Sequence, residues 1–390
     1  MPKVLISDAL SESARAVFAE RGVEADFRPD LGKDPAALAG IIGGYDGLAI
    51  RSATKATAEL IAQADELKVI GRAGIGVDNV DLAAASARGI VVMNTPFGNS
   101  ITTAEHAVAM MLSLARQIPA ADRSTRAGKW EKSRFMGVEV TGKVLGVVGT
   151  GNIGSIVASR ALGLRMRVIA YDPFLSPERA EDLGIEKVDL DQLLARSDFI
   201  TIHTPLNDHT RNLIDAKALG QAKKGLRIVN CARGGIVDEA ALADAMRSGQ
   251  VAGAALDVFV DEPARENPLF EFEEVVVTPH VGASTNEAQE NVALQVAEQM
   301  AEYLTTGAVV NALNMASVSA EEAPKLKPYM RLCTQLGSFA GQLTRTGLKG
   351  AHITFAGKAA ELNTRPLVAS LLEALLRPIT DSVNMVNAPL

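Results

Sequence analysis

The chain has 390 residues, of which 47% are hydrophobic and 22% are charged, and its formal net charge is −7. These values are ordinary for a folded protein of two or three domains. The acidic balance argues against a nucleic-acid-binding protein, because neutralising phosphates needs clustered lysines and arginines.

The N-terminal segment MPKVLISDAL runs directly into an apolar, strand-like stretch and has no signal-peptide pattern. No apolar run approaches the roughly 20 residues that a membrane span needs. The two cysteines, Cys231 and Cys333, imply no disulfide framework. We therefore expect a cytoplasmic protein with no membrane and no nucleic-acid partner.

Short apolar runs alternate with helical patterns along the chain, which is typical of parallel sheets covered by helices. A first series of strands is expected at 3–8, 47–52, 68–73 and 90–94. A second series is expected at 143–148, 167–171, 199–203, 226–230, 254–259 and 275–278. Long helices are expected at 104–115 and 287–304.

Two loops interrupt this order and indicate domain junctions. Residues 94–102 and 279–285 each contain Pro and Gly, followed by Ser and Thr before a long helix. Residues 315–328 are polar and contain proline, which predicts a linker. The region from 329 to 390 has helix-like and strand-like pieces.

The strongest motif is GTGNIG, in which Gly149, Gly151 and Gly154 lie between a strand and a helix. In a dinucleotide site these glycines allow a tight turn, a close pyrophosphate and close helix packing, and the helix N-terminus attracts the phosphates. Asp172, 21 residues after Gly151, ends the next strand and can bind the ribose hydroxyls. The motif predicts NAD rather than NADP; the competing interpretation is an ordinary glycine-rich turn.

Three candidate catalytic residues follow later strands, at the sheet edge where such folds bind ligands. Arg233 can hold a carboxylate bidentately, although it could also pair with a structural acid. His280 can accept a hydroxyl proton, although a single histidine is more often a cap or core residue. Glu262 is the candidate that orients His280, with Asp257 and Asp261 as competitors.

The remaining histidines have weaker support. His203 ends a strand and could wall the cofactor site, but packing is the simpler interpretation, and His106 suits a satisfied side chain on an apolar helix. No group of residues has metal-ligand spacing, so no metal is predicted. There is no GxSxG nucleophile motif.

These motifs together resemble the D-isomer-specific 2-hydroxyacid dehydrogenases over about residues 1–315. The resemblance is carried by GTGNIG with YDP, NCARGGIVDE, LDVFVDEP and VTPHVGAST. The phrases GRAGIGVDNVDL and NCARGGIVDEAAL are most similar to members that oxidise 3-phospho-D-glycerate with NAD, the first step of phosphorylated L-serine biosynthesis. The resemblance assigns catalysis to Arg233, Glu262 and His280.

The resemblance also implies an α/β fold with a discontinuous substrate domain. A Rossmann-type NAD-binding domain at 98–283 is inserted in a flavodoxin-like α/β substrate domain, made of 1–97 and a return helix at 284–316. Residues 317–390 resemble the start of an α+β intervening domain of regulatory type. Two chains are expected to pair through their nucleotide domains, with a tetramer left open.

Further site residues are implied at matching positions. Besides the three glycines and Asp172, the cofactor is expected to contact Ile75, Asn152, Ile153, Thr204, Cys231, Ala232, Asp257, Gly282 and Ala283. Asn152 stands where many members have arginine, so we expect modestly weaker cofactor binding.

Substrate choice is expected to depend on two arginines, Arg51 and Arg72, which suit a substrate carrying a phosphate as well as a carboxylate. Each could instead pair with a surface acid. Gly74 would expose its backbone N–H to the carboxylate, and Ser52 and Asn79 complete the expected substrate set. Lys132 and Arg134 are candidates to add positive charge across the dimer.

Two other functions fit the same motifs. One is a reductase of glyoxylate, hydroxypyruvate or another 2-keto acid. The other is an NAD(H)-sensing co-repressor that binds peptide motifs and retains the catalytic set.

Overall fold

The chain folds into two compact units, which we describe separately. The computed structural model describes residues 1–319, 321–344, 348, 350–380 and 382–389. Unit one contains Met1–Asn99 and Asn286–Leu390, and unit two contains Ser100–Thr285.

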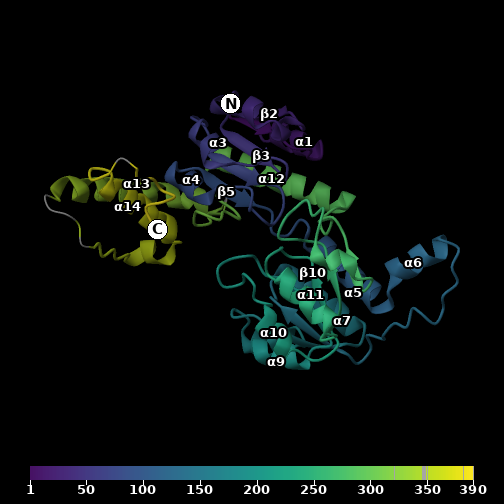
Figure 1. The fold of residues 1–390 in the computed structure, drawn as a ribbon. Coiled ribbons are helices and arrows are strands. Elements are labelled where there is room, and N and C mark those ends of the chain that lie inside the picture. The colour runs from purple at the N-terminus through teal and green to yellow at the C-terminus, as the bar shows by residue number, and fades with distance from the viewer. Residues whose placement is uncertain (320, 345–347, 349, 381, 390) are drawn as a thin grey trace. The chain divides into compact units, whose positions relative to one another are not determined.

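Unit one is built on a five-stranded parallel sheet with the order β2-β1-β3-β4-β5 (Figure 1). This order is that of flavodoxin-like folds. Apart from the edge strand β2, the strands are buried apolar runs, as expected when helices cover both faces of a parallel sheet. Their bounds are β1 Lys3–Ile6, β2 Glu24–Phe27, β3 Gly47–Ile50, β4 Val69–Arg72 and β5 Val91–Asn94.

Short helices and 3-10 turns connect these strands. Several begin after an Asp or Thr whose side chain accepts a hydrogen bond from the first turn, which supplies the missing partner of that N–H. The elements are α1 Ser13–Glu20, η1 Leu31–Lys33, α2 Pro35–Ala39, η2 Ile42–Gly44, α3 Ala58–Ala62 and α4 Leu82–Ala87.

The long helix α12 (Asn286–Thr306) returns the chain to unit one and packs on β4 and α1. Its inner face buries Val292, Val296 and Met300. Gly71, in β4, makes this approach possible, since a Cβ there would lie 2.1 Å from the sulfur of Met300.

The C-terminal part of unit one is helical. α13 (Glu322–Leu343) and α14 (Arg365–Leu376) lie side by side, with η4 (Gly357–Glu361) between them in the chain (Figure 1). Gly337 lets them approach closely, because a Cβ there would lie 2.3 Å from the carbonyl oxygen of Leu371.

Two expectations for this region are corrected. The linker expected at 315–328 is helical from Glu322, with Pro328 inside α13. Its buried Leu326 joins the core around β1, which favours helix over linker. The strand-like pieces expected between 329 and 390 form no strand among the described residues. The expected 317–390 range includes positions 320, 345–347, 349, 381 and 390, which lie outside the described residues.

Unit two contains a seven-stranded parallel sheet with the order β12-β11-β10-β9-β6-β7-β8. Counted from β6, this is the strand order of a Rossmann fold, extended by one strand. Strands are added on one side of β6 up to β8 and on its other side from β9 onward, and in such sheets this change of order makes a crevice at the carboxyl ends of β6 and β9. The bounds are β6 Val144–Val148, β7 Arg167–Tyr171, β8 Glu186–Lys187, β9 Phe199–Ile202, β10 Leu226–Asn230, β11 Val251–Leu256 and β12 Val275–Val277.

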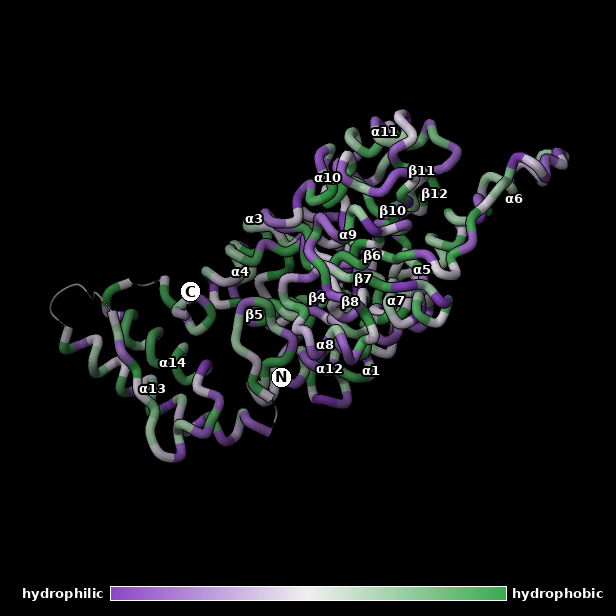
Figure 2. The backbone as a smooth tube through the Cα atoms, turned by 90° about the horizontal axis from the view of Figure 1, so that it is seen from below, coloured by the Kyte–Doolittle hydropathy of each residue, from purple (hydrophilic) through white to green (hydrophobic). Residues whose placement is uncertain are grey.

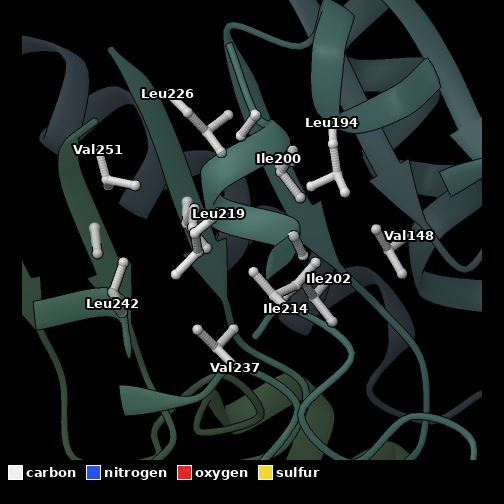
Figure 3. Packing of buried hydrophobic residues seen from close by; sticks show 14 of the residues in the cluster. Val148, Leu194, Ile200, Ile202, Ile214, Leu219, Leu226, Val237, Leu242 and Val251 are labelled. Atoms are coloured by element: carbon white, nitrogen blue, oxygen red, sulfur yellow. The ribbon is translucent and has the colours of Figure 1, made fainter. Parts of the chain in front are cut away.

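Helices cover both faces of this sheet. One face packs on α9 (Leu190–Arg196), α10 (Ala216–Gln221) and α11 (Glu239–Arg247), and Figure 3 shows Leu194, Leu219 and Leu242 from these helices in one cluster with Ile200 and Ile202 of β9. The other face packs on α5 (Ser100–Arg116), α7 (Asn152–Gly163) and α8 (Pro177–Asp182). The 3-10 helix η3 (Pro268–Glu271) precedes β12.

An arm projects from unit two after α5. It consists of α6 (Ile118–Arg126) and the following loop to residue 139, and both views show it standing away from the rest of the unit (Figures 1 and 2). Trp130 is 80% exposed on it, and Ile118 and Met136 are also exposed. These three apolar side chains therefore lack a covering surface within the described part of the chain.

The expected strands are all present. β7 and β10 have the expected bounds and the ends of the others shift by up to three residues; β11 starts and stops three residues early. Two strands were missed, β2 and β8, which lie at sheet edges and expose polar residues. No described helix combines the length and apolarity needed to cross a membrane.

Candidate active site

The glycine-rich loop follows β6 at the crevice of unit two. A Cβ at position 149 would lie 2.7 Å from the carbonyl oxygen of His203, and one at position 154 would lie 1.9 Å from the carbonyl oxygen of Gly149. Gly149 also has φ +88°, which favours glycine. Gly151, by contrast, faces no protein atom within 4 Å. Protein contacts require two of the glycines, and the third leaves its backbone open to a ligand such as a pyrophosphate.

Asp172 holds this loop from the end of β7. Its Oδ2 accepts from the backbone N (2.7 Å) and Oγ1 (2.9 Å) of Thr150, and its Oδ1 accepts from Phe174 N at 2.8 Å. Asn152 and Ile153 form the first turn of α7. The carboxylate therefore stands beside the helix N-terminus where phosphates are favoured.

His203 adds a second mark of a ligand site. Its Nε2 lies 2.8 Å from Thr201 Oγ1, while its Nδ1 is buried and has no hydrogen-bond partner among the described residues. Burial lowers the pKa of His203 to about 3, so the ring is neutral. Simple packing, the interpretation favoured from the sequence, leaves this buried nitrogen unpaired.

His280 and Glu262 meet in the loops after β12 and β11. His280 Nδ1 lies 2.7 Å from Glu262 Oε2, and Glu262 Oε1 accepts from Phe259 N at 3.1 Å. The other ring nitrogen of His280, Nε2, has no partner within the described part of the chain. The imidazole is thus oriented through one nitrogen and presents the other, which is what a general base requires.

Asp257 bonds the turn on both sides of His280. Its Oδ1 accepts from Thr278 Oγ1 (2.6 Å) and Val281 N (2.8 Å), and its Oδ2 accepts from Gly282 N at 2.8 Å. Burial raises the pKa of Asp257, but these bonds and that from His106 outweigh it and lower the pKa below its ordinary value.

The three candidate carboxylates thus differ in what they touch. Glu262 contacts the ring of His280, Asp257 holds the backbone around it, and Asp261 is exposed. His280 itself has φ +54°, a left-handed conformation that is uncommon outside glycine and that histidine adopts more often than most residues. His106, expected to be a satisfied side chain, lies 3.2 Å from Thr278 Oγ1 and 3.4 Å from Asp257 Oδ1.

Arg233 lies in the turn after β10, held by a buried asparagine that the sequence analysis missed. Asn230 donates from Nδ2 to the carbonyl of Arg233 (2.8 Å) and accepts from Ala232 N (3.0 Å). Arg233 Nη1 donates to Ala232 O at 2.7 Å. Gly234 packs this turn on the next loop, because a Cβ there would lie 1.9 Å from the carbonyl oxygen of Phe259. A polar residue ending a buried strand was the signal for Asn230.

A pocket of about 560 Å³ lies beside His280. Its wall is mostly apolar, and includes Phe259, Phe270, Val277 and Pro279 with Glu262 and His280. The acid–base pair therefore borders a hollow of the size that ligand sites have.

The other expected cofactor residues of unit two also follow strands. Thr204 follows β9, Cys231 and Ala232 follow β10, and Gly282 and Ala283 follow β12. Burial and the charge of Asp257 raise the pKa of the Cys231 thiol far above its ordinary range, so it remains protonated and is no nucleophile.

Arg51 and Arg72 stand at one edge of the sheet of unit one. Arg51 directly follows β3, and Arg72 ends β4, where it pairs in register with Ile50. Gly74 leaves room for the Arg72 guanidinium, since a Cβ there would lie 1.5 Å from its Nη1. The sheet thus brings the two cations to neighbouring strand ends.

One expectation about this edge is wrong. The N–H of Gly74 is not exposed to a ligand, because it donates to Thr95 Oγ1 at 2.6 Å. Asn79 donates from Nδ2 to the carbonyl oxygens of Arg51 and Thr54, each at 2.6 Å, so this group holds a loop, and a contact of Asn79 with the substrate stays a prediction. Ser52 is exposed, and Ile75 accepts from Asn94 Nδ2.

On the arm, Arg134 bonds Glu131 at 3.0 Å and Glu273 at 2.6 Å. Its charge is therefore balanced within its own chain, whereas it was a candidate to act across a dimer. The described residues contain no group of three or more His, Cys, Asp or Glu side chains that could hold a metal ion.

The chain matches two family descriptions. Residues 108–282 match the NAD binding domain of the D-isomer specific 2-hydroxyacid dehydrogenases. Residues 325–390 match the D-3-phosphoglycerate dehydrogenase intervening domain.

Among curated relatives, D-3-phosphoglycerate dehydrogenase of Synechocystis sp. is 45% identical over 390 residues, covering 100% of this chain and 70% of the relative. That of Bacillus subtilis is 42% identical over 389 residues, covering 100% and 73%. Among solved structures, a glyoxylate reductase from Paecilomyes thermophila is 30% identical with a TM-score of 0.74, covering 80% of this chain and 98% of that one. A D-lactate dehydrogenase from Aquifex aeolicus, complexed with NAD and lactic acid, is 26% identical with a TM-score of 0.67, covering 77% and 95%.

Proposed function

The chain belongs to the D-3-phosphoglycerate dehydrogenase family, and from that premise we propose that its active site is the pair His280–Glu262 with Arg233. The enzyme is an NAD-dependent D-2-hydroxyacid dehydrogenase that oxidises 3-phospho-D-glycerate to 3-phosphonooxypyruvate, the first step of phosphorylated L-serine biosynthesis. The observation that supports the substrate is the similarity over all 390 residues of this chain, which continues through the intervening domain at 325–390. The glyoxylate reductase covers only 80% of the chain.

The residues of unit two fit NAD. The open backbone at Gly151 would receive the pyrophosphate, Asp172 the adenosine ribose, and the unpaired Nδ1 of His203 marks a polar position near the loop. When bound, NAD⁺ accepts the hydride from C2 of the substrate.

The side chains have separate tasks. Arg233 binds the substrate carboxylate, and His280 Nε2 takes the C2 hydroxyl proton. Glu262 fixes the tautomer with the proton on Nδ1 and balances the charge of the protonated ring. Asp257 keeps the His280 turn in place. Arg51 and Arg72 bind the phosphate.

We assign NAD binding to residues 98–283, substrate binding to 1–97 and 284–316, and an intervening domain of regulatory type to 317–390. We further propose a homodimer formed through the nucleotide domains. The exposed Ile118, Trp130 and Met136 of the arm support it, because apolar side chains on a projecting element are typical of an interface. The two free cysteines suit the cytoplasm.

The test of the site is His280→Ala. It should lower kcat by about 10²–10⁴, the contribution of a positioned acid–base group, while NADH still binds. His209→Ala, an exposed histidine of the same unit, is the matched control. Turnover at the wild-type rate in His280→Ala would remove the assignment.

A further inference from the structure

The loops that follow β1 and β3 are joined by one buried carboxylate. Asp8 is 2% exposed, and it spends both oxygens on the segment Arg51–Thr54. Its Oδ2 accepts from Arg51 N at 2.6 Å and Thr54 N at 3.2 Å, and its Oδ1 accepts from Thr54 Oγ1 at 2.7 Å.

Asn79 holds the same segment through its carbonyl groups. Asp8 accepts from the N–H groups of Arg51 and Thr54, whereas Asn79 donates to the carbonyl groups of these two residues at 2.6 Å each. The segment is therefore bonded through both backbone polar groups at both of its ends.

The packing around Asp8 leaves little freedom. A Cβ at position 32 would lie 2.1 Å from Thr54 Oγ1 and 2.3 Å from Asp8 Oδ1, so only glycine fits there without displacement. Ser7 Oγ lies 2.8 Å from Thr54 Oγ1. The guanidinium of Arg51 is also linked to this loop, because its Nη1 donates to Ala9 O at 3.4 Å.

A buried carboxylate is costly unless hydrogen bonds compensate its lost hydration. Here every compensating bond comes from one short segment, which begins with the arginine. Asp8 is also too buried to touch a substrate. Its effect can therefore reach a ligand only through the position of the segment, and a segment held at four backbone groups loses little freedom when Arg51 engages an anion.

We propose that Asp8, together with Asn79, is a positioning residue that sets Arg51 for the phosphate of the substrate. This inference rests on the proposed role of Arg51 in binding that phosphate. It predicts that Asp8 affects selectivity for phosphorylated substrate and not the chemistry at C2.

The experiment compares kcat/KM for 3-phospho-D-glycerate and for D-glycerate in Asp8→Ala, Asp8→Asn, Arg51→Gln and Asp8→Ala/Arg51→Gln. Asp8→Ala should lower the ratio of the two values by about 10- to 100-fold, the equivalent of one or two bonds to a charged group. The loss should lie in KM. Asp8→Asn should restore most of the ratio, because its amide oxygen can serve both N–H groups while Thr54 reverses its hydroxyl.

The double variant tests whether Asp8 acts through Arg51. If Asp8 acts through Arg51, Asp8→Ala lowers the ratio no further once Arg51 is Gln. An equal further loss in that background would overturn the inference. A normal ratio in Asp8→Ala together with a reduced ratio in Arg51→Gln would also overturn the inference, while the role of Arg51 in binding the phosphate would stand. A normal ratio in Arg51→Gln would overturn that role and this inference with it.

Folding is controlled in two ways. Asp46→Ala removes a carboxylate that accepts from Lys3 N and Lys68 Nζ before β3, at the opposite end of the strands, and should lower stability with an unchanged ratio. If Asp8→Ala does not fold, Asn79→Ala takes its place, since it releases the same segment; an unchanged ratio there overturns the proposal.

Discussion

The sharpest prediction concerns Glu262→Gln, because the structure dictates which way the new amide must face. Phe259 N donates to Oε1 of Glu262, so the amide oxygen must take that position. The NH₂ group then points at His280 Nδ1, which lies 2.7 Å from Oε2. The imidazole must accept at Nδ1 and carry its proton on Nε2, which is the wrong tautomer for a base.

The size of the expected fall in kcat follows from the other orientation of the new amide. Turning the amide round restores the active tautomer but leaves Phe259 N–H facing NH₂, which costs about 1–3 kcal/mol. That cost leaves the active form at about one part in 5 to 150. Loss of the negative charge beside the protonated ring adds about tenfold or more. We therefore expect kcat to fall by about 10²–10³-fold.

The assay is steady-state NADH formation together with an NADH binding titration, which should be unchanged. The neighbouring exposed acid provides the control, since Asp261→Asn should keep wild-type kcat. A kcat within about threefold of wild type in Glu262→Gln would refute the tautomer argument.

Two further predictions concern Asp257, which holds the His280 turn, and the glycine-rich loop after β6. Asp257→Asn should lower the free energy of unfolding by about 2–4 kcal/mol, because one of the three bonds to the His280 turn is lost and an N–H is left unpaired; kcat should fall about 10- to 100-fold. The pKa of Asp257 is lower in the folded than in the unfolded state. Its contribution to the free energy of unfolding is therefore complete above the unfolded pKa and is lost as the pH falls through the folded pKa. Urea titrations should show the difference in free energy of unfolding between wild type and Asp257→Asn becoming smaller in acid. Asp198→Asn, at the amino ends of the central strands β6 and β9, should lower stability with kcat intact, and equal kcat losses in both variants would contradict the role of Asp257. Gly151→Ala should keep the melting temperature and weaken NADH binding, whereas Gly154→Ala should lower the melting temperature, because its Cβ would lie 1.9 Å from a carbonyl oxygen; calorimetry that finds full NADH affinity in Gly151→Ala would exclude the loop from the site.

The sequence predicted the central strands well, because a parallel strand buried on both faces is a continuous apolar run. It did not predict β2 and β8, since edge strands carry polar residues and gain their identity only from a neighbour. Pro328 in α13 also misled the prediction of a linker, because burial of Leu326 outweighs the local cost of proline.

For the site, the pattern identified groups but not their contacts. Three acids near His280 were equivalent in sequence, and only the fold separates Glu262 on the ring from Asp257 on the backbone. The hydrogen bonds of Gly74 and Asn79 were missed for the same reason, as their partners Thr95 and Thr54 are distant along the chain. A hydrogen-bond partner more than about one turn away leaves no local signal.

The most direct test of the assigned substrate is NADH formation by the wild-type enzyme with 3-phospho-D-glycerate, compared with D-glycerate, malate and lactate. We predict rapid NAD-dependent oxidation of the phosphorylated substrate and much lower kcat/KM for the other three. Equal or greater kcat/KM for an unphosphorylated acid would contradict the assigned substrate, and no turnover with any of the four would contradict the assignment as a dehydrogenase of this family.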